Sequence, residues 1–197
     1  MQQNDVLALF ERAGAIAHGH FILSSGLHSP CFLRKNLVFM DPKATEQLGS
    51  ALGDRLRELH DVDLVVTPAI GGLLPAYEVA RRLGVPMIYF EREEGRFVLR
   101  RGFTIPSGAR VALVEDVVTT GRLSKEIIEA VTAHGGRVVS AGYVVDRSPS
   151  GFEIDVPKVS LMRFEAPVYR PDELPDLLAI LPAETPGSNH AAHVSRS

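Results

Sequence analysis

Residues 111–124 read VALVEDVVTTGRLS, and this stretch decides the fold of the chain. Its apolar first half predicts a buried strand, and the apolar spacing that follows predicts a helix. Thr119, Thr120 and Gly121 lie between the two. In a parallel sheet such a turn lies beyond the carboxyl end of the strand, where the backbone N–H groups at a helix start converge on one point. The stretch therefore predicts a phosphate cradle with two hydroxyl groups added.

Glu115 and Asp116 stand directly before that turn. Two carboxylates beside a phosphate would repel it unless they face sugar hydroxyls or a Mg²⁺ ion. A second interpretation needs no ligand, because the acids can belong to the start of the helix with Thr119 or Thr120 as its cap. Both interpretations stay open on these residues alone. The chain has no Gly-Lys pair and no G-x-G-x-x-G, so neither a Walker loop nor a dinucleotide fingerprint is predicted.

Strand and helix patterns alternate through the middle of the chain. Short apolar runs predict strands over 63–67, 85–90, 110–116 and 137–146, and helical spacing predicts helices over 43–59, 73–83 and 123–134. Because the strands are apolar throughout, they predict a parallel sheet covered on both faces, in an α/β fold. Residues 1–40 predict an irregular leader with a short helix near 6–13. The polar, charged segment 91–108 suits a hairpin or a mobile flap.

The composition fits one globular domain. The 197 residues are 45% hydrophobic and 23% charged, which predicts a single well-filled domain over 1–182. Residues 183–197 include few large apolar side chains and are expected to be disordered, and His190 and His193 alone make a poor metal site. A net charge of −3 argues against a strongly basic nucleic-acid binder. With no apolar run of membrane length and no signal-peptide pattern, we expect a cytoplasmic protein.

Cysteine and lysine usage narrows the chemistry further. The single cysteine, Cys31, excludes an intrachain disulfide and a Cys-rich zinc site. Only four of the 21 basic residues are lysines, and they are Lys35, Lys43, Lys125 and Lys158. None of them lies between residues 44 and 124. We therefore expect anions to be bound by arginine, by backbone N–H groups or by a metal.

Two acids, two variable positions and Thr-Thr-Gly after an apolar strand resemble the phosphoribosyl-pyrophosphate (PRPP) signature of the type I phosphoribosyltransferases. Three other segments resemble the orotate phosphoribosyltransferases in particular, namely FILSSGLHSPCF at 21–32, VVTPAIGGLLPAYEVARRLGVP at 65–86 and VVDR at 144–147. The resemblance implies the type I phosphoribosyltransferase fold, a central mostly parallel sheet flanked by helices. It also implies a small N-terminal hood over 1–40 and a β-hairpin flap over 91–108.

The same resemblance implies an activity. Enzymes of this family transfer the phosphoribosyl group from PRPP to orotate and form orotidine 5'-monophosphate and pyrophosphate, with Mg²⁺ as cofactor, in pyrimidine synthesis. It further implies a homodimer in which the flap of one subunit completes the site of the other. No nucleic-acid or membrane partner is implied.

The resemblance also assigns roles to individual residues. PRPP is expected to be bound by Ile70, Gly71, Arg92, Glu115, Asp116, Val117, Val118, Thr119, Thr120, Gly121, Arg122 and Leu123. Orotate is expected to be bound by Ser25, Phe32, Thr119 and Arg147, since the arginine fork suits a carboxylate. The catalytic residues implied are Arg92, Arg96 and Asp116. Mg²⁺ would be held mostly through PRPP, with Asp116 as the candidate protein ligand.

The chain departs from the family's pattern around the flap. Many orotate enzymes carry lysines and a histidine where residues 92–98 read REEGRFV. A lysine is also common where Gly71 and Ser24 stand, and a small residue where Arg122 stands. Arg100 and Arg101 of the flap either replace the positive charge of the missing lysines and histidine or belong to a solvated hairpin. These changes mark either a short-flap subgroup of the same enzyme or an altered activity.

Two other functions therefore stay open. One is a phosphoribosyltransferase for another base, such as a purine, which would not need Arg147 or the match at 21–32. The other is a non-catalytic regulator that senses PRPP or a nucleotide through the same fold. The missing lysines favour this second alternative, but such a regulator would normally need a nucleic-acid surface or an extra domain.

Overall fold

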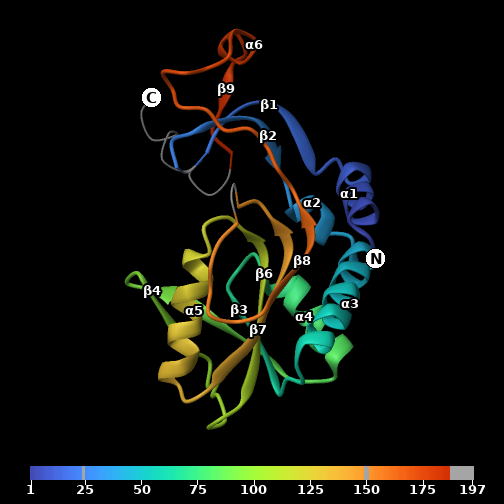
Figure 1. The fold of residues 1–197 in the computed structure, drawn as a ribbon, viewed down its shortest axis with the longest axis vertical. Coiled ribbons are helices and arrows are strands. Elements are labelled where there is room, and N and C mark those ends of the chain that lie inside the picture. Colours follow the sequence, from blue (N-terminus) through green and yellow to red (C-terminus); the bar gives the residue numbers. More distant parts are fainter. Residues whose placement is uncertain (24, 149–150, 187–197) are drawn as a thin grey trace.

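The computed structural model describes residues 1–23, 25–148 and 151–186. Within these residues a six-stranded sheet has the order β5-β4-β3-β6-β7-β8, and a three-stranded sheet of order β2-β1-β9 lies above it (Figure 1). The strands are β1 (Ile16–Ile22), β2 (His28–Leu33), β3 (Leu64–Pro68), β4 (Met87–Glu93), β5 (Arg96–Leu99), β6 (Arg110–Val118), β7 (Arg137–Asp146), β8 (Lys158–Arg163) and β9 (Ala183–Glu184). The helices are α1 (Gln3–Arg12), α2 (Asn36–Phe39), α3 (Pro42–Leu59), α4 (Leu73–Leu83), α5 (Arg122–Ala133) and α6 (Asp176–Ala179).

The six-stranded sheet is parallel except at its edge, where β5 pairs antiparallel with β4. The four predicted strands correspond to β3, β4, β6 and β7, and the three predicted helices of the main body correspond to α3, α4 and α5. The α/β class and the mostly parallel sheet are thus confirmed. Two details differ from our predictions. β8 is an additional strand, and β6 continues two residues past its predicted end at Asp116, to Val118.

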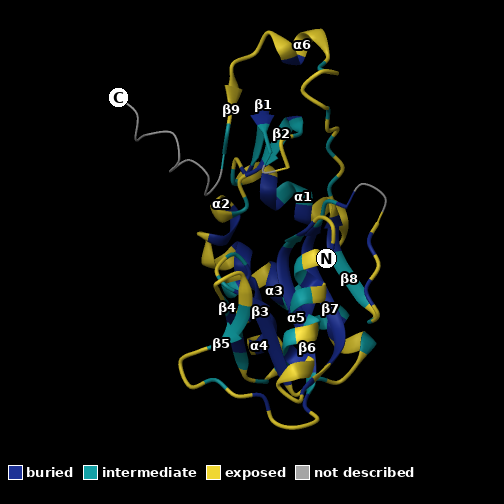
Figure 2. Cartoon of the chain, turned by 90° about the vertical axis from the view of Figure 1, so that its left-hand side faces the viewer, coloured by how far each residue is buried: buried dark blue, intermediate teal, exposed yellow. Residues whose placement is uncertain are grey.

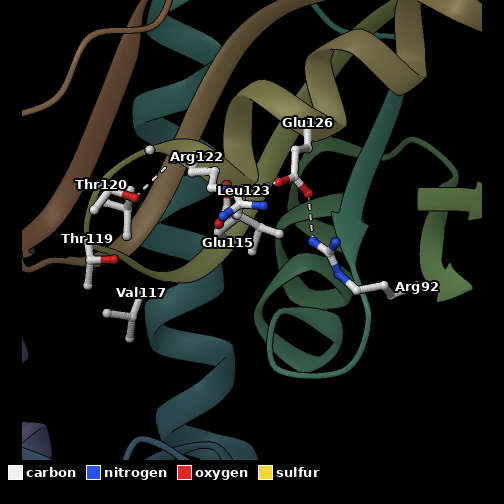
Figure 3. Close-up of a pocket in the computed structure, with 10 residues that line it drawn as sticks. Arg92, Glu115, Val117, Thr119, Thr120, Arg122, Leu123 and Glu126 are labelled. Atoms are coloured by element: carbon white, nitrogen blue, oxygen red, sulfur yellow. Dashed lines mark hydrogen bonds and ion pairs between the residues drawn. The ribbon is translucent and has the colours of Figure 1, made fainter. Parts of the chain in front are cut away.

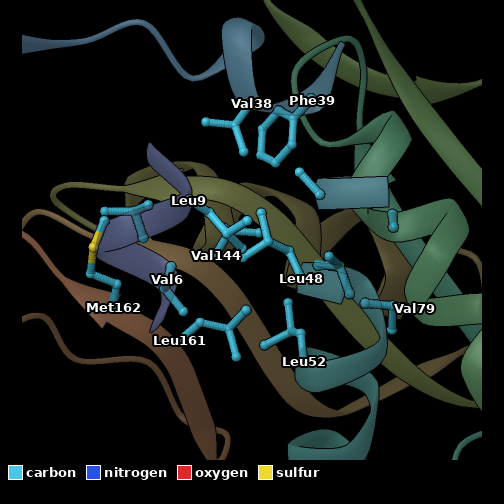
Figure 4. Close-up of a cluster of buried hydrophobic side chains, with 14 of the residues drawn as sticks. Val6, Leu9, Val38, Phe39, Leu48, Leu52, Val79, Val144, Leu161 and Met162 are labelled. Atoms are coloured by element: carbon cyan, nitrogen blue, oxygen red, sulfur yellow. The ribbon is translucent and has the colours of Figure 1, made fainter. Parts of the chain in front are cut away.

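Hydrophobic layers cover both faces of this sheet. On one face α1, α3 and α4 pack against the strands, and Leu48 and Val79 are among their fully buried side chains (Figure 4). On the other face α5 packs through Ile127. Because successive strand residues point to opposite faces, Val114 of β6 belongs to the first layer and Leu113 to the second. Burial on both sides explains why β6 is apolar throughout its first half.

The leader forms a small sheet, so our expectation of an irregular segment is wrong for β1 and β2. These strands pair antiparallel, with Ile16 opposite Leu33 and Ile22 opposite His28. β9 pairs parallel with β1 at His20 and Phe21. We call the β2-β1-β9 sheet the hood sheet. The glycine and histidines of β1 interrupt the apolar pattern by which a strand is recognised in a sequence. The strand is stabilised by pairing with β2 and β9.

The described chain continues past residue 182 into a segment for which we expected disorder. There β9 pairs with β1, and Figure 2 shows β9 and α6 beside the hood sheet, far from the main sheet. The rest of that segment, including His190 and His193, lies outside the described residues, as does Ser24. In the part of the chain that the structure describes, no helix is long and apolar enough to span a membrane.

The predicted flap begins as a hairpin. β4 and β5 pair Phe90 with Leu99 and Glu93 with Arg96. The two residues between them, Glu94 and Gly95, both have left-handed backbone angles, with φ of 49° and 82°. Two consecutive residues with positive φ are typical of the turns that match the twist of a two-stranded ribbon. The hairpin alternative is therefore confirmed, and mobility of this segment stays a prediction.

Helices α3 and α4 pack unusually close together because α3 carries glycine where they meet. A Cβ atom on Gly49 would collide with Cβ of Glu78 and lie 3.1 Å from its backbone carbon. A Cβ atom on Gly53 would meet Cγ of Arg82 at 3.0 Å. Only the second neighbour is part of a flexible side chain that can move aside.

We expect Gly49→Ala to lower the free energy of unfolding by about 1–3 kcal/mol, because the added methyl group forces the two helices apart. Gly53→Ala is the matched control and should change it by less than about 1 kcal/mol, since Arg82 can shift while alanine favours the helix. Urea unfolding of both variants measures the difference. A stabilised Gly49→Ala variant, as helix propensity alone predicts, would contradict the close packing.

Candidate active site

A cavity of about 420 Å³ opens at the carboxyl end of β6, where the strand passes into α5 (Figure 3). Its lining is Arg92, Glu115, Val117, Val118, Thr119, Thr120, Gly121, Arg122, Leu123 and Glu126. The PRPP residues expected from β6 and the following turn are therefore brought together here, with Asp116 beside them in the same strand. This is the edge of a parallel sheet where ligands are usually bound.

Gly121 shapes the turn. Its φ of 71° is left-handed, and a Cβ atom there would collide with the ring of Phe152. α5 begins directly after it, with Gly121 as the N-cap and no side-chain cap. The N-cap is therefore Gly121 and neither Thr119 nor Thr120, although Thr120 Oγ1 accepts a hydrogen bond from the Arg122 N–H over 3.4 Å. Both threonines are exposed beside the cavity. The N–H groups that follow in the first turn of this 12-residue helix, and the hydroxyl protons of both threonines, remain available to an anion.

Glu115 is a buried acid held by a chain of hydrogen bonds. Only 2% of the residue is exposed. Tyr143 donates to Ser124 Oγ over 2.9 Å, and Ser124 donates to Glu115 Oε1 over 2.6 Å. Burial, reinforced by the neighbouring Asp116 charge, raises the pKa of Glu115 to about 7 against the hydrogen bond from Ser124. Glu115 can therefore exchange a proton in the neutral pH range.

Asp116 points to the other face of the strand and is also buried, at 8% exposure. Its Oδ1 accepts a hydrogen bond from the Val117 N–H over 2.7 Å. Its Oδ2 lies 2.5 Å from Nζ of Lys35, which stands directly before α2. Among the described residues no directed hydrogen bond reaches Oδ2, so the contact with Lys35 is an ion pair.

Gly71 completes this corner from the loop between β3 and α4. A Cβ atom on Gly71 would collide with Asp116 Oδ2 and lie 3.1 Å from Nζ of Lys35. The loop backbone, the carboxylate and the lysine therefore meet at one point. The fold thus brings a lysine to this corner from outside the stretch 44–124, and our expectation that anions are met by arginine, backbone N–H groups or a metal stays a prediction.

Arg92 and Arg122 flank the opposite side of the cavity, and Glu126 holds both (Figure 3). Arg92 Nη2 lies 2.6 Å from Glu126 Oε2, and Arg122 Nε lies 2.8 Å from Glu126 Oε1. Hydrogen bonds from these two arginines lower the pKa of Glu126. Arg96, by contrast, is exposed at the tip of the hairpin, and the described lining of the cavity does not include it.

Comparison with known proteins identifies the family to which this chain belongs. Residues 43–168 match the model described as the phosphoribosyl transferase domain. The orotate phosphoribosyltransferase of Parvibaculum lavamentivorans is 52% identical over 98% of this chain and 100% of its own length. That of Phenylobacterium zucineum is 53% identical over 95% and 97%. The chain belongs to the orotate phosphoribosyltransferase family. The crystal structure of the orotate phosphoribosyltransferase from Aeropyrum pernix, 28% identical, matches 81% of this chain and 93% of its own with a TM-score of 0.68.

The residues that the family resemblance assigns to orotate do not all converge. Arg147 follows β7 and is half-buried, and burial lowers its pKa while the Cys31 thiol of β2 opposes that shift. Among the described residues no carboxylate pairs with its guanidinium. Phe32 follows Cys31 in β2, and its ring packs on Phe21 at 5.7 Å between ring centroids.

Ser25 lies in the exposed turn between β1 and β2. Its hydroxyl accepts a hydrogen bond from the Leu27 N–H over 3.4 Å. The structure brings Cys31 close enough to Arg147 for their charges to interact, and the roles of Ser25 and Phe32 toward orotate stay predictions. Strand alternation could have indicated this, but only after β2 was recognised as a strand.

The described residues fit the way Mg²⁺ binds in a substrate complex. No three His, Cys, Asp or Glu side chains within them lie close enough to hold a metal ion. Asp116 Oδ2, in contrast, is a buried carboxylate oxygen with capacity for another partner. Mg²⁺ is commonly held by one or two carboxylates together with substrate oxygens.

We expect Glu115→Gln to stabilise the protein above neutral pH. Because the pKa of Glu115 is raised from 4.5 to about 7, its stabilising effect is complete below about pH 4.5 and is lost as the pH rises through 7. A glutamine cannot ionise and avoids that loss. The free energy of unfolding of the variant should match the parent near pH 4 and exceed it by about 3 kcal/mol at pH 8.

Glu126→Gln is the matched control with the opposite sign. The pKa of Glu126 is lowered, so its stabilising contribution is present at neutral pH and is lost in acid. This variant should be less stable than the parent at neutral pH, and the difference should vanish as the pH falls. Denaturant unfolding from pH 8 down to a pH below the lowered pKa of Glu126 measures both, and a pH-independent effect of Glu115→Gln would contradict its raised pKa.

Proposed function

We propose that this protein transfers the phosphoribosyl group of PRPP to orotate, forming orotidine 5'-monophosphate and pyrophosphate. The observation that carries the choice of orotate is Arg147, a half-buried guanidinium with no carboxylate partner among the described residues. Leaving a buried cation unpaired is costly, and a substrate carboxylate is the partner that suits it. The relatives from Parvibaculum and Phenylobacterium, both orotate phosphoribosyltransferases, support the same choice over a purine base.

The turn after β6 would hold the 5'-phosphate. Its N–H groups at the start of α5 and the hydroxyls of Thr119 and Thr120 surround the cavity and carry no opposing charge. Arg122 adds a cation at the rim. Asp116 would accept hydrogen bonds from the ribose hydroxyls, while Glu115 can donate or accept one according to its protonation. Backbone and hydroxyl contacts thus fix the end of PRPP that does not react.

The chemistry at the ribose needs placement more than covalent help. The bond from C1 to the pyrophosphate oxygen breaks as the bond from C1 to the orotate nitrogen forms, and the nitrogen's proton is released. Positive charge develops at the ribose, so the site must hold the two ligands in line, neutralise the leaving group and exclude water. Mg²⁺, held by Asp116 with substrate oxygens, would neutralise pyrophosphate charge. Arg92 would add a cation from the flap, which we expect to close over the site.

A homodimer is part of the proposal, and exposed apolar side chains support it. Leu37 and Met40 lie at α2, and Ile70, Leu74 and Tyr77 lie at or just before the start of α4, all exposed. Lys35 before α2 meets Gly71 before α4, so the two groups belong to neighbouring segments. An exposed apolar group of this kind commonly marks a protein interface. A cytoplasmic location also stays a prediction.

We expect the purified protein to consume orotate in the presence of PRPP and Mg²⁺, measured by the loss of orotate absorbance. Arg147→Ala should raise the KM for orotate about 10- to 100-fold, because the carboxylate loses a charged partner. Arg137→Ala, an exposed arginine at the other end of β7, is the matched control and should leave it unchanged. An inactive parent protein, or full orotate affinity without Arg147, would overturn the proposal.

For the dimer, we expect Leu74→Glu to produce a monomer in analytical ultracentrifugation, since a buried charge opposes association. Leu177→Glu changes a second exposed apolar group, on α6, and should leave the dimer intact. If Leu177→Glu dissociates the protein and Leu74→Glu does not, the interface lies at the hood instead.

A further inference from the structure

We propose that Lys35 binds the pyrophosphate group of PRPP while it remains paired with Asp116. This inference rests on the proposed function and adds to it a residue that the sequence pattern did not indicate. Lys35 and Asp116 are far apart in the chain, and their ion pair at 2.5 Å joins the segment before α2 to the end of β6. It places a lysine at the carboxyl edge of the sheet, where we expected anions to be met by arginine, backbone N–H groups or a metal.

The position of the ammonium group makes it accessible to a ligand. The Lys35 side chain is 34% exposed, whereas that of Asp116 is 11% exposed. The lysine therefore lies on the solvent side of the pair. An ammonium group has three donors, and Asp116 Oδ2 occupies at most one of them. Lys35 can hold the carboxylate and a phosphate oxygen at the same time.

The lack of space around Gly71 also indicates that Lys35 supplies the cation at this corner. The loop before α4 approaches Nζ of Lys35 so closely that a side chain at 71 would collide with Asp116. A lysine on this loop is thus excluded while Lys35 and Asp116 keep their places. The cation that Gly71 cannot supply comes instead from the segment before α2.

Three flap arginines are already paired with protein carboxylates. Arg92 is paired with Glu126, Arg100 with Glu93 and Arg101 with Glu91. Each guanidinium keeps further donors, but the carboxylate in each pair repels an incoming phosphate. Lys35, in contrast, is paired with Asp116, which we expect to bind the ribose of PRPP. The ion pair therefore lies within the expected binding site, and Lys35 does not have to move to reach the substrate.

The test is calorimetric titration of the protein with pyrophosphate and Mg²⁺, which needs no turnover. We expect Lys35→Ala to weaken pyrophosphate binding about 10-fold or more, as loss of a charge-assisted contact does. Lys35→Arg should retain part of the affinity. Lys43→Ala, an exposed lysine at the start of α3, removes the same charge away from the site and should bind like the parent. Thermal unfolding checks that each variant is folded.

A double-mutant cycle separates direct binding from an effect through Asp116. If Lys35 contacts pyrophosphate, Lys35→Ala also weakens binding in an Asp116→Asn background. If Lys35 only holds Asp116 in place, its removal has no further effect there, and the proposal is overturned. Equal affinity of the parent and Lys35→Ala overturns it as well. A parent that binds pyrophosphate through Lys35 but does not consume orotate would overturn the proposed function and leave the role of Lys35 intact.

Discussion

Two consecutive carboxylates buried at the end of β6 constrain everything around the site. Neighbouring strand residues point to opposite faces, so each acid must be satisfied by a different layer of the protein. Glu115 faces α5 and receives the hydrogen bond of Ser124. Asp116 faces the other way and meets Lys35 beside the loop that precedes α4. Because each buried acid needs a polar partner, Ser124 is positioned on one side of the site and Lys35 on the other.

The different partners of Glu115 and Asp116 give the two acids different chemical properties. Glu115 is satisfied by neutral hydroxyl groups, so burial dominates and raises its pKa into the neutral range. Asp116 is satisfied by a cation and a backbone N–H. One strand thus carries an acid whose pKa lies in the neutral range and a neighbour that is paired with a cation. That difference suits a site where hydroxyl groups and a charged leaving group must be bound side by side.

The sequence predicted the main sheet because its signals are local. β3, β4, β6 and β7 are apolar runs, and α3 to α5 show helical spacing, so each could be recognised without its neighbours. The cradle at Gly121 was predicted for the same reason. β1 and β8 have no such pattern and are stabilised by pairing with other strands. Lys35 was missed because no local signal connects it to Asp116, and only the fold brings the two together.

The cations expected around the leaving pyrophosphate are of two kinds, flap arginines in exposed ion pairs and Lys35 in its ion pair with Asp116. Each flap arginine that is paired with an acid forms an exposed ion pair, and such pairs contribute only about 0–1 kcal/mol. Exchange of Glu126 for a phosphate therefore costs Arg92 little, although its guanidinium also stacks over Phe97 at 4.2 Å. Lys35 needs no exchange, because its ion pair with Asp116 leaves donors free. A site with one cation already in place and others held by weak pairs can bind PRPP first and recruit the flap afterwards.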